Sequence, residues 1–332
     1  MPVTGEFVRD TEPFRRELLA HCYRMLGSAD EAEDLVQDTY LRAWRSYDAF
    51  EGRSSVRTWL YRIATNVCLT AIERRGRRPL PSDLAGPGEV HDGTEIRWLQ
   101  PIPDALVSSE SNDPAEIVTR RDSLRLALIA TMQYLPARQR AVLLLRDVLA
   151  WPAAEVAVVL DTTTAAVKST LQRARARIDE VAPAADHLVE PAEPEARALL
   201  HRYIAAFENA DPVALKEVLR EDVMLELPPS PTWFHGDAAR QCAVGGLGSA
   251  GDWRMVPTAA NGQLAAAAYH RNGDGVYQAY GIVSLTVTTT GIARLVVFAD
   301  PGLFPIFGLP PTHNPSQAGG HPTQTPSGKA SR

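Results

Sequence analysis

The chain has 332 residues, enough for two or three domains, and its hydrophobic content of 45% and charged content of 22% are ordinary for globular proteins. Its net charge of −6, taken over the whole chain, argues against a nucleic-acid-binding protein. The three cysteines, Cys22, Cys68 and Cys242, lack the spacing of a metal site or a disulfide framework. The sequence shows neither the apolar core of a signal peptide nor a run of the roughly 18 apolar residues that a membrane span needs. We therefore expect a cytoplasmic protein that binds no membrane, metal or cofactor.

The charge is distributed unevenly along the chain. Residues 52–78 hold seven arginines and one glutamate, and residues 123–178 hold eight basic and three acidic residues. The segment between them is acidic, with nine acidic residues against three arginines in 82–122. Positive charge gathered on two separate segments is typical of a DNA-binding surface in an acidic protein.

The N-terminal part of the sequence predicts three helices. The first covers Pro13–Gly27, and the second covers Ala29–Tyr47 with Ser28 as N-cap and a glutamate at the capping-box spacing. The second helix has an acidic face at i, i+3 and i+7, made by Glu31, Asp34 and Asp38. The third begins after Ser54 or Ser55 and ends in the sequence ERRGRRP.

Aromatic residues alternate with arginines on the third helix. Flat rings that stack on bases, together with guanidinium groups that follow the backbone, suit single-stranded DNA, and Trp59, Tyr61 and Arg62 have this character. Taken singly, the aromatic residues would more often lie in a protein core, so both interpretations stay open on composition alone.

A second group of helices follows the acidic, Pro- and Gly-rich segment 80–122, which we interpret as a partly extended tether. Helices are predicted at Ser123–Tyr134, Pro136–Leu149, Pro152–Leu160 and Thr164–Asp179. The last two, joined by the sequence DTTT, predict a helix-turn-helix with Thr162 or Thr163 as N-cap and with Asp161 in place of the usual glycine. The alternative is a solvated basic helix in an ordinary bundle.

The pattern changes after a second linker, residues 182–194. Two helices precede strands predicted around Val223–Leu227 and at Trp253–Thr258, Gln263–His270, Val276–Thr288 and Ile292–Ala299. Turns such as Asn261-Gly262 favour hairpins, so residues 195–309 are predicted to be an α+β domain with a curved antiparallel sheet. Residues 310–332 are predicted to be a disordered tail.

Two segments carry a family resemblance. The sequence from DEAEDLVQDTYLRAW to TAIERR resembles region 2 of a bacterial sigma factor of the extracytoplasmic-function type, and LPARQRAVLLLRDVLAWPAAEVAVVLDTTTAAVKSTLQRARARI resembles region 4. The resemblance implies two all-α domains, residues 10–79 and 123–181, that bind core RNA polymerase and promoter DNA. It implies docking on the clamp of the largest subunit and the flap of the second-largest subunit, and it names no anti-sigma factor.

The resemblance also assigns roles to residues. Polymerase docking would use Asp34, Leu35, Val36, Gln37, Asp38, Tyr40 and Leu41. Contacts to the melting −10 element would use Arg53, Ser54, Ser55, Arg57, Trp59, Arg62, Asn66, Arg74 and Arg75. Contacts to the duplex −35 element would use Thr163, Thr164, Lys168, Ser169, Gln172, Arg173 and Arg175. The chain is therefore expected to be a transcription initiation factor and not an enzyme.

The C-terminal domain resembles the cone-shaped SnoaL-like fold, through sequences such as PPSPTWFHG and GVYQAYGIVSLTV. Some relatives of this fold are enzymes with an acid or base inside the cone, and the candidates for such a role are Glu226, His235, Asp237, Tyr269 and His270. No spacing pairs them, so we expect no catalytic residue, a regulatory domain and room for a small ligand. The alternatives are a conventional helix-turn-helix regulator with a ligand-sensing domain, and an enzyme of this fold.

Overall fold

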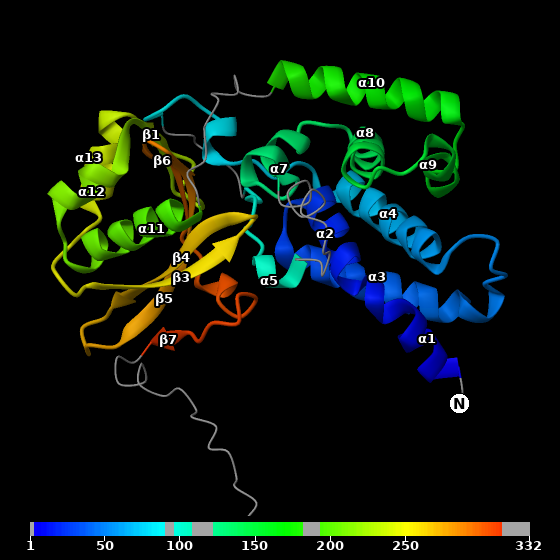
Figure 1. Ribbon diagram of the computed structural model, residues 1–332, viewed down its shortest axis with the longest axis horizontal. Coiled ribbons are helices and arrows are strands. Elements are labelled where there is room, and N and C mark those ends of the chain that lie inside the picture. Colours follow the sequence, from blue (N-terminus) through cyan, green and yellow to red (C-terminus); the bar gives the residue numbers. More distant parts are fainter. Residues whose placement is uncertain (1–2, 90–95, 108–121, 182–192, 314–332) are drawn as a thin grey trace, which may run out of the picture.

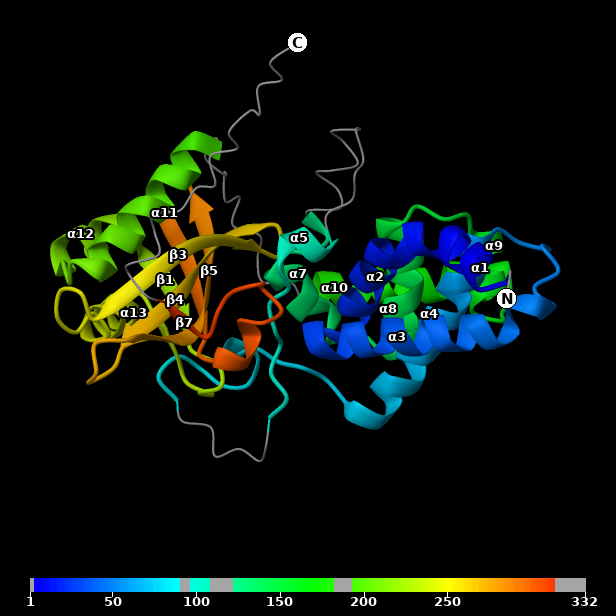
Figure 2. The same cartoon turned by 90° about the horizontal axis from the view of Figure 1, so that it is seen from below.

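The computed structural model describes residues 3–89, 96–107, 122–181 and 193–313. Helices occupy one half of the molecule and a curved sheet with its covering helices occupies the other (Figure 1). Helices α5 and α7 lie between the two halves, as the perpendicular view also shows (Figure 2). The chain therefore has two helical domains on one side and a mixed domain on the other.

The N-terminal helical domain contains four helices. Their bounds are α1 Val3–Thr11, α2 Arg15–Leu26, α3 Ala29–Ser46 and α4 Val56–Arg75, with short 3-10 turns at Glu12–Phe14 and Tyr47–Ala49. The predicted N-caps are confirmed, because the side chain of Ser28 accepts from the Glu31 amide and that of Ser55 from the Thr58 amide. The sequence did not predict α1, whose Phe7 ring packs edge-on against Trp44 of α3.

The connecting segment, residues 80–107, differs from the tether that its composition favours. It contains a 3-10 turn at Pro81–Asp83 and the short helix α5 at Asp104–Val107. Leu80, Leu99 and Ile102 are fully buried. These apolar side chains belong to the hydrophobic core that runs through the helical domains. The segment is therefore packed against the rest of the protein both before and after residues 90–95.

The helix-turn-helix domain, residues 122–181, contains α7 Leu126–Met132, α8 Ala137–Leu143 with a π-helical turn at Leu144–Val148, α9 Ala153–Val159 and α10 Thr164–Val181. Thr163 accepts from the Ala166 amide at 3.1 Å and so acts as N-cap of α10. Asp161 has a φ of 48°, which fits its place in a turn where glycine is usual.

The C-terminal domain, residues 193–313, has three helices, α11 Glu193–Glu208, α12 Pro212–Val218 and α13 Asp237–Gly245. The strands are β1 Leu219–Glu226, β2 Trp233–His235, β3 Trp253–Ala260, β4 Gln263–Arg271, β5 Tyr277–Thr288, β6 Gly291–Phe298 and β7 Thr312–His313. The strand order is β2-β1-β6-β5-β4-β3, with β7 paired to β5.

Two expectations for this domain need correction. The sheet is not wholly antiparallel, because β1 pairs in parallel with β6, which follows it only after β2, α13 and the antiparallel strands β3, β4 and β5. The predicted tail begins later than residue 310, since Thr312 and His313 pair with β5; the rest of that tail lies outside the described residues.

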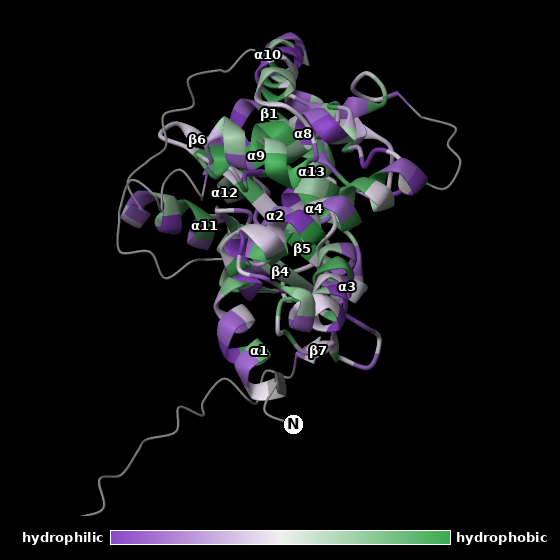
Figure 3. Cartoon of the chain, turned by 90° about the vertical axis from the view of Figure 1, so that its right-hand side faces the viewer, coloured by the Kyte–Doolittle hydropathy of each residue, from purple (hydrophilic) through white to green (hydrophobic). Residues whose placement is uncertain are grey.

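Two hydrophobic cores hold the chain together. One fills the cone between the sheet and helices α11–α13. The other runs without a break through both helical domains and the opposite face of the sheet, where Ala265, Tyr269 and Phe304 are fully buried. Figure 3, which looks onto the end formed by the helical domains, shows hydrophobic residues on α8 and α9. The three domains therefore share this second core, while the first belongs to the C-terminal domain alone.

Candidate nucleic-acid interface

The recognition helix α10 lies at the outer edge of the molecule (Figure 1). Val167, Leu171 and Ala174 face the core of its own domain. All seven residues assigned to the −35 element are exposed: Thr163, Thr164, Lys168, Ser169, Gln172, Arg173 and Arg175. The helix thus presents one continuous polar and basic face, which is the geometry for entry into a major groove.

The polar residues of this face differ in their own contacts. Arg175 forms a bidentate ion pair with Asp147, at 2.9 and 2.7 Å. The Ser169 hydroxyl donates to the Ala166 carbonyl, and Arg173 donates to Thr170. Lys168 and Gln172 stand one turn apart on the exposed stripe, and an exposed amide and ammonium have the chemistry to bond with base edges.

Replacement of Gln172 by alanine should relax base preference at one or two positions of the −35 element. An amide paired with an adenine edge discriminates by about 1–3 kcal/mol, and that discrimination is lost with the side chain. Arg175→Ala is the matched control on the same face, since loss of a phosphate contact weakens every sequence alike and lowers the log–log salt slope by about one. Binding to a set of single-base variants measures both. If Gln172→Ala lowered the binding affinity equally for all sequences, the proposed contact between Gln172 and a base would be contradicted.

Helix α4 and the residues just before it expose five of the nine residues assigned to the −10 element. Arg53, Ser55, Arg62, Asn66 and Arg74 are exposed, while Ser54 and Trp59 are half-buried. The Trp59 ring lies 4.8 Å from the Phe50 ring, measured between centroids, so it is already partly packed. Arg75 ends α4, and its side chain lies outside the described residues.

Two residues of α4 are not available to DNA in this arrangement. Tyr61 is fully buried, so of the two interpretations that composition leaves open for it, the structure has the core position. The Arg57 guanidinium lies 5.2 Å from the ring centroids of both Tyr61 and Trp151, and it forms a bidentate bond with Glu17. Trp151 belongs to the helix-turn-helix domain, so Arg57 is held at the contact between the two helical domains.

A buried arginine reinforces the same contact. Arg140 of α8 is 2% exposed, and its Nη1 donates to the Met25 carbonyl in the last turn of α2 and to the Gln133 side chain. Its Nη2 donates to the carbonyls of Gln133 and Leu135. One guanidinium thus satisfies carbonyls at the ends of two helices in different domains. Burial lowers the pKa of Arg140 to about 10, so it stays protonated at neutral pH.

Helix α3 carries a face suited to a protein partner. Asp34 and Gln37 are exposed, Asp38 pairs with Arg42 at 2.9 Å, and Leu41 and Trp44 are 55% and 41% exposed. The sequence assignment left out Trp44, which stands one turn from Leu41. An acidic face with a large exposed apolar centre is typical of an interaction surface.

Three other residues assigned to polymerase docking are engaged inside the domain. Val36 is fully buried and Leu35 is 9% exposed, so their side chains pack in the core and do not reach a partner in this arrangement. The half-buried Tyr40 donates its hydroxyl to the Thr11 carbonyl. These side chains therefore hold α3 in place within its own domain.

The candidate acid and base residues of the C-terminal domain do not meet in a cavity. Glu226 is fully buried, but it pairs with Arg294 at 2.6 Å and accepts from the Ser82 amide of the connecting segment. His235, Asp237 and His270 are exposed, and Tyr269 is buried with its hydroxyl donating to the Pro310 carbonyl. The cone encloses about 90 Å³, lined mainly by apolar residues such as Tyr203, Phe207 and Trp253.

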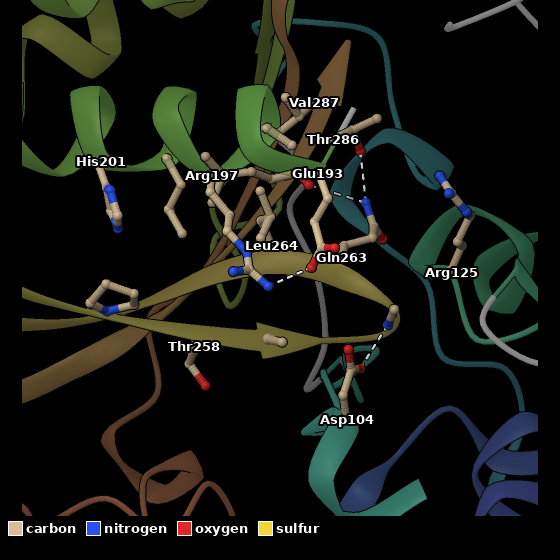
Figure 4. A pocket seen from close by; sticks show the side chains of 16 residues that line it. Asp104, Arg125, Glu193, Arg197, His201, Thr258, Gln263, Leu264, Thr286 and Val287 are labelled. Carbon is tan, nitrogen blue, oxygen red and sulfur yellow. Dashed lines mark hydrogen bonds and ion pairs between the residues drawn. The ribbon is translucent and has the colours of Figure 1, made fainter. Parts of the chain in front are cut away.

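A larger cavity of about 470 Å³ opens where the C-terminal domain meets the rest of the chain (Figure 4). Its walls come from α11, the β3–β4 hairpin, α5 and the start of the helix-turn-helix domain. Charged side chains line it, namely Asp104, Arg125, Glu193 and Arg197. Its shape thus depends on how these units are packed together.

None of the helices that the structure describes has the length and hydrophobicity of a membrane span. Within the same described ranges, His, Cys, Asp and Glu side chains nowhere gather in a group suited to a metal ion.

Comparisons with known proteins place two family matches on the two helical domains. The family model for Sigma-70 region 2 matches residues 11–78, and that for Sigma-70 region 4 matches residues 125–178. The chain is 51% identical to the ECF RNA polymerase sigma factor SigG of Mycobacterium tuberculosis over 318 residues, which cover 92% of this chain and 84% of the relative. It is 32% identical to the probable ECF sigma factor SigI of the same organism, over 64% of this chain and 67% of that one.

A solved structure has the same fold over most of the chain. The crystal structure of the Mycobacterium tuberculosis extracytoplasmic function sigma factor SigJ superposes with a TM-score of 0.59. The match has 24% sequence identity and covers 92% of this chain and 99% of that chain.

Proposed function

The chain belongs to the extracytoplasmic-function sigma factors of RNA polymerase, and we propose that three of its exposed faces each perform one step of promoter-specific initiation. In the proposal, the acidic and apolar face of α3 docks on core polymerase, α4 holds the melted −10 element, and α10 reads the −35 element. The protein works by binding and not by catalysis, in the cytoplasm where polymerase and DNA meet.

The distance between the two promoter elements favours helical domains that stand apart on DNA. The elements are named for positions 25 base pairs apart, roughly 85 Å along a duplex that rises about 3.4 Å per base pair. In the structure the same domains touch, with Arg57 held between Glu17 and Trp151. We therefore propose that this closed arrangement is the resting form and that promoter binding opens it.

The C-terminal domain is proposed to regulate this opening. It contacts the connecting segment through Glu226 and the Ser82 amide, and through Trp233, which donates to the Ala85 carbonyl at 2.7 Å. The single observation that carries the proposal is the unbroken core, which places this domain against both helical domains at once. A domain that binds the closed form alone shifts the equilibrium toward it.

Two other functions have less support. A conventional helix-turn-helix regulator would use α9 and α10 but would leave the exposed face of α3 and the basic face of α4 without a role. An enzyme of the cone fold would need an acid or base in the cone, and the side chains that line the cone's cavity are apolar or weakly polar.

Removal of residues 193–332 should raise promoter-dependent transcription by core polymerase at limiting sigma concentration. The domain stabilises the closed form, so its loss increases the competent fraction and the apparent affinity for polymerase and promoter. Transcript yield over a titration of full-length and truncated chain measures this, with circular dichroism as a control for the helical fold. Unchanged or lower yield from a folded truncated chain would contradict the regulatory role.

A further inference from the structure

The turn between β3 and β4 lies in an unusual place for a hairpin turn. Asn261 and Gly262 have positive φ angles of 58° and 66°, as a tight two-residue turn requires. Hairpin tips normally face solvent, but the Asn261 side chain is 0% exposed. The next hairpin of the same sheet is different: Asn272 accepts from the amides of Asp274 and Val276 in its own turn.

The Asn261 side chain binds three separate parts of the chain. Its Nδ2 donates to the Tyr23 hydroxyl of α2 at 2.7 Å and to the Leu124 carbonyl, just before α7, at 2.8 Å. Its Oδ1 accepts from the Ile102 amide of the connecting segment at 3.0 Å. One amide thus joins the N-terminal helical domain, the connecting segment and the helix-turn-helix domain to the C-terminal domain.

The neighbours of Asn261 strengthen the same junction. The Asn261 amide donates to the Ile102 carbonyl, and the Gly262 amide donates to the Asp104 carboxylate at 2.7 Å, a bond seen in Figure 4. Gln263 accepts from the Leu126 amide at 3.2 Å at the start of α7. These bonds come from a single turn that also forms one wall of the cavity of about 470 Å³.

The chemistry of a buried amide makes this junction selective for the closed arrangement. Each polar atom of Asn261 has its partner only when Tyr23, Ile102 and Leu124 converge. A buried amide that loses its partners is costly, so partial separation of the domains is disfavoured until water can enter. The contact therefore favours two discrete states, latched and released.

We infer that the β3–β4 turn, Asn261–Gln263, is a latch through which the C-terminal domain holds the two helical domains closed. The inference rests on the proposed regulatory role and names the contact that performs it. Asn261 is a positioning residue, since it acts on the promoter-binding faces only through the relative placement of their domains. The binding partner of the turn is the junction made by Tyr23, Ile102 and Leu124.

The distance between the two helical domains in the full-length chain tests the latch. Spin labels on Ala49→Cys and Ala154→Cys, both exposed positions, report this distance in a Cys242→Ser background. Asn261→Gly keeps the turn, because glycine accepts a positive φ, and removes only the amide. Asp104→Ala is a second variant, which removes the bond to the Gly262 amide from outside the C-terminal domain. Asn272→Gly is the matched control in the next hairpin.

The latch predicts that the ratio of open to closed molecules rises at least about tenfold in Asn261→Gly, because each hydrogen bond lost changes this ratio by a factor of a few. The ratio should rise less in Asp104→Ala and should not change in Asn272→Gly. Distances in Asn261→Gly and Asp104→Ala equal to those of the unaltered chain would overturn the latch and leave the proposed regulation standing. A free unaltered chain that is already open would overturn the proposed regulation itself.

Discussion

Replacement of Arg140 by methionine should lower the free energy of unfolding by about 3–5 kcal/mol, because several buried carbonyls lose their donor and each unsatisfied buried acceptor costs about 1–3 kcal/mol. The methionine keeps most of the apolar length of the side chain but has no donors. The carbonyls of Met25, Gln133 and Leu135 then lose their bonds to the guanidinium in a buried position. Because Met25 lies in one helical domain and Arg140 in the other, the variant should also weaken the closed contact.

Arg138→Met, in the same helix, is the control for this change. Arg138 is exposed, and an exposed substitution typically alters stability by less than about 0.5 kcal/mol. Urea unfolding of both variants beside the unaltered chain measures the difference. Equal midpoints and slopes for the two variants would show that the Arg140 bonds contribute little to the packing of the helical domains.

His21 should make the N-terminal helical domain sensitive to acid. Burial, with a smaller contribution from the nearby Arg24, lowers the pKa of His21 from 6.5 to about 3. The ring bonds to the Thr65 hydroxyl at 3.0 Å and lies against the Tyr61 ring, so the folded protein holds it neutral. The unfolded chain takes up a proton below pH 6.5 that the folded chain does not, so folding is destabilised as the pH falls from 6.5 toward 3.

The expected contribution is about 1.4 kcal/mol for each pH unit in that window, because one unit of pKa difference corresponds to this energy. His21→Gln has no group that titrates there and retains a polar end near Thr65. The free energy of unfolding, measured from pH 6.5 to 5, should therefore fall less steeply with acid in His21→Gln than in the unaltered chain. The test compares the slopes of unfolding free energy against pH and not the absolute stabilities. Equal slopes in the two proteins would contradict a neutral, buried His21.

Local structure was predictable wherever a short stretch of sequence determines it. Ser28 and Ser55 act as N-caps, Thr163 caps the recognition helix, and Asp161 takes the left-handed conformation that its place in the turn requires. The amphipathic pattern of α10 was also sufficient to separate its buried face from its exposed one. These features depend on neighbours within one or two helical turns.

Features that depend on distant partners were not predictable in the same way. The composition of the connecting segment favours a tether, and nothing near Ile102 in the sequence indicates that Asn261 covers it. The sequence offers Glu226 as a candidate acid or base, but in the fold this carboxylate pairs with Arg294, far along the chain. The resemblance assigns Arg57 to DNA and leaves Tyr61 open between base stacking and the core, and only the packing of Trp151 against both shows that they lie at the contact between the helical domains.

The proposed role of the closed chain is tested most directly by transcription in vitro with purified core polymerase on a promoter library. We predict that the full-length chain directs polymerase to discrete start sites, each preceded by the same pair of sequence elements. We also predict that the chain lacking residues 193–332 uses the same sites at lower concentration. Failure of both chains to open any start site would contradict the account as a whole.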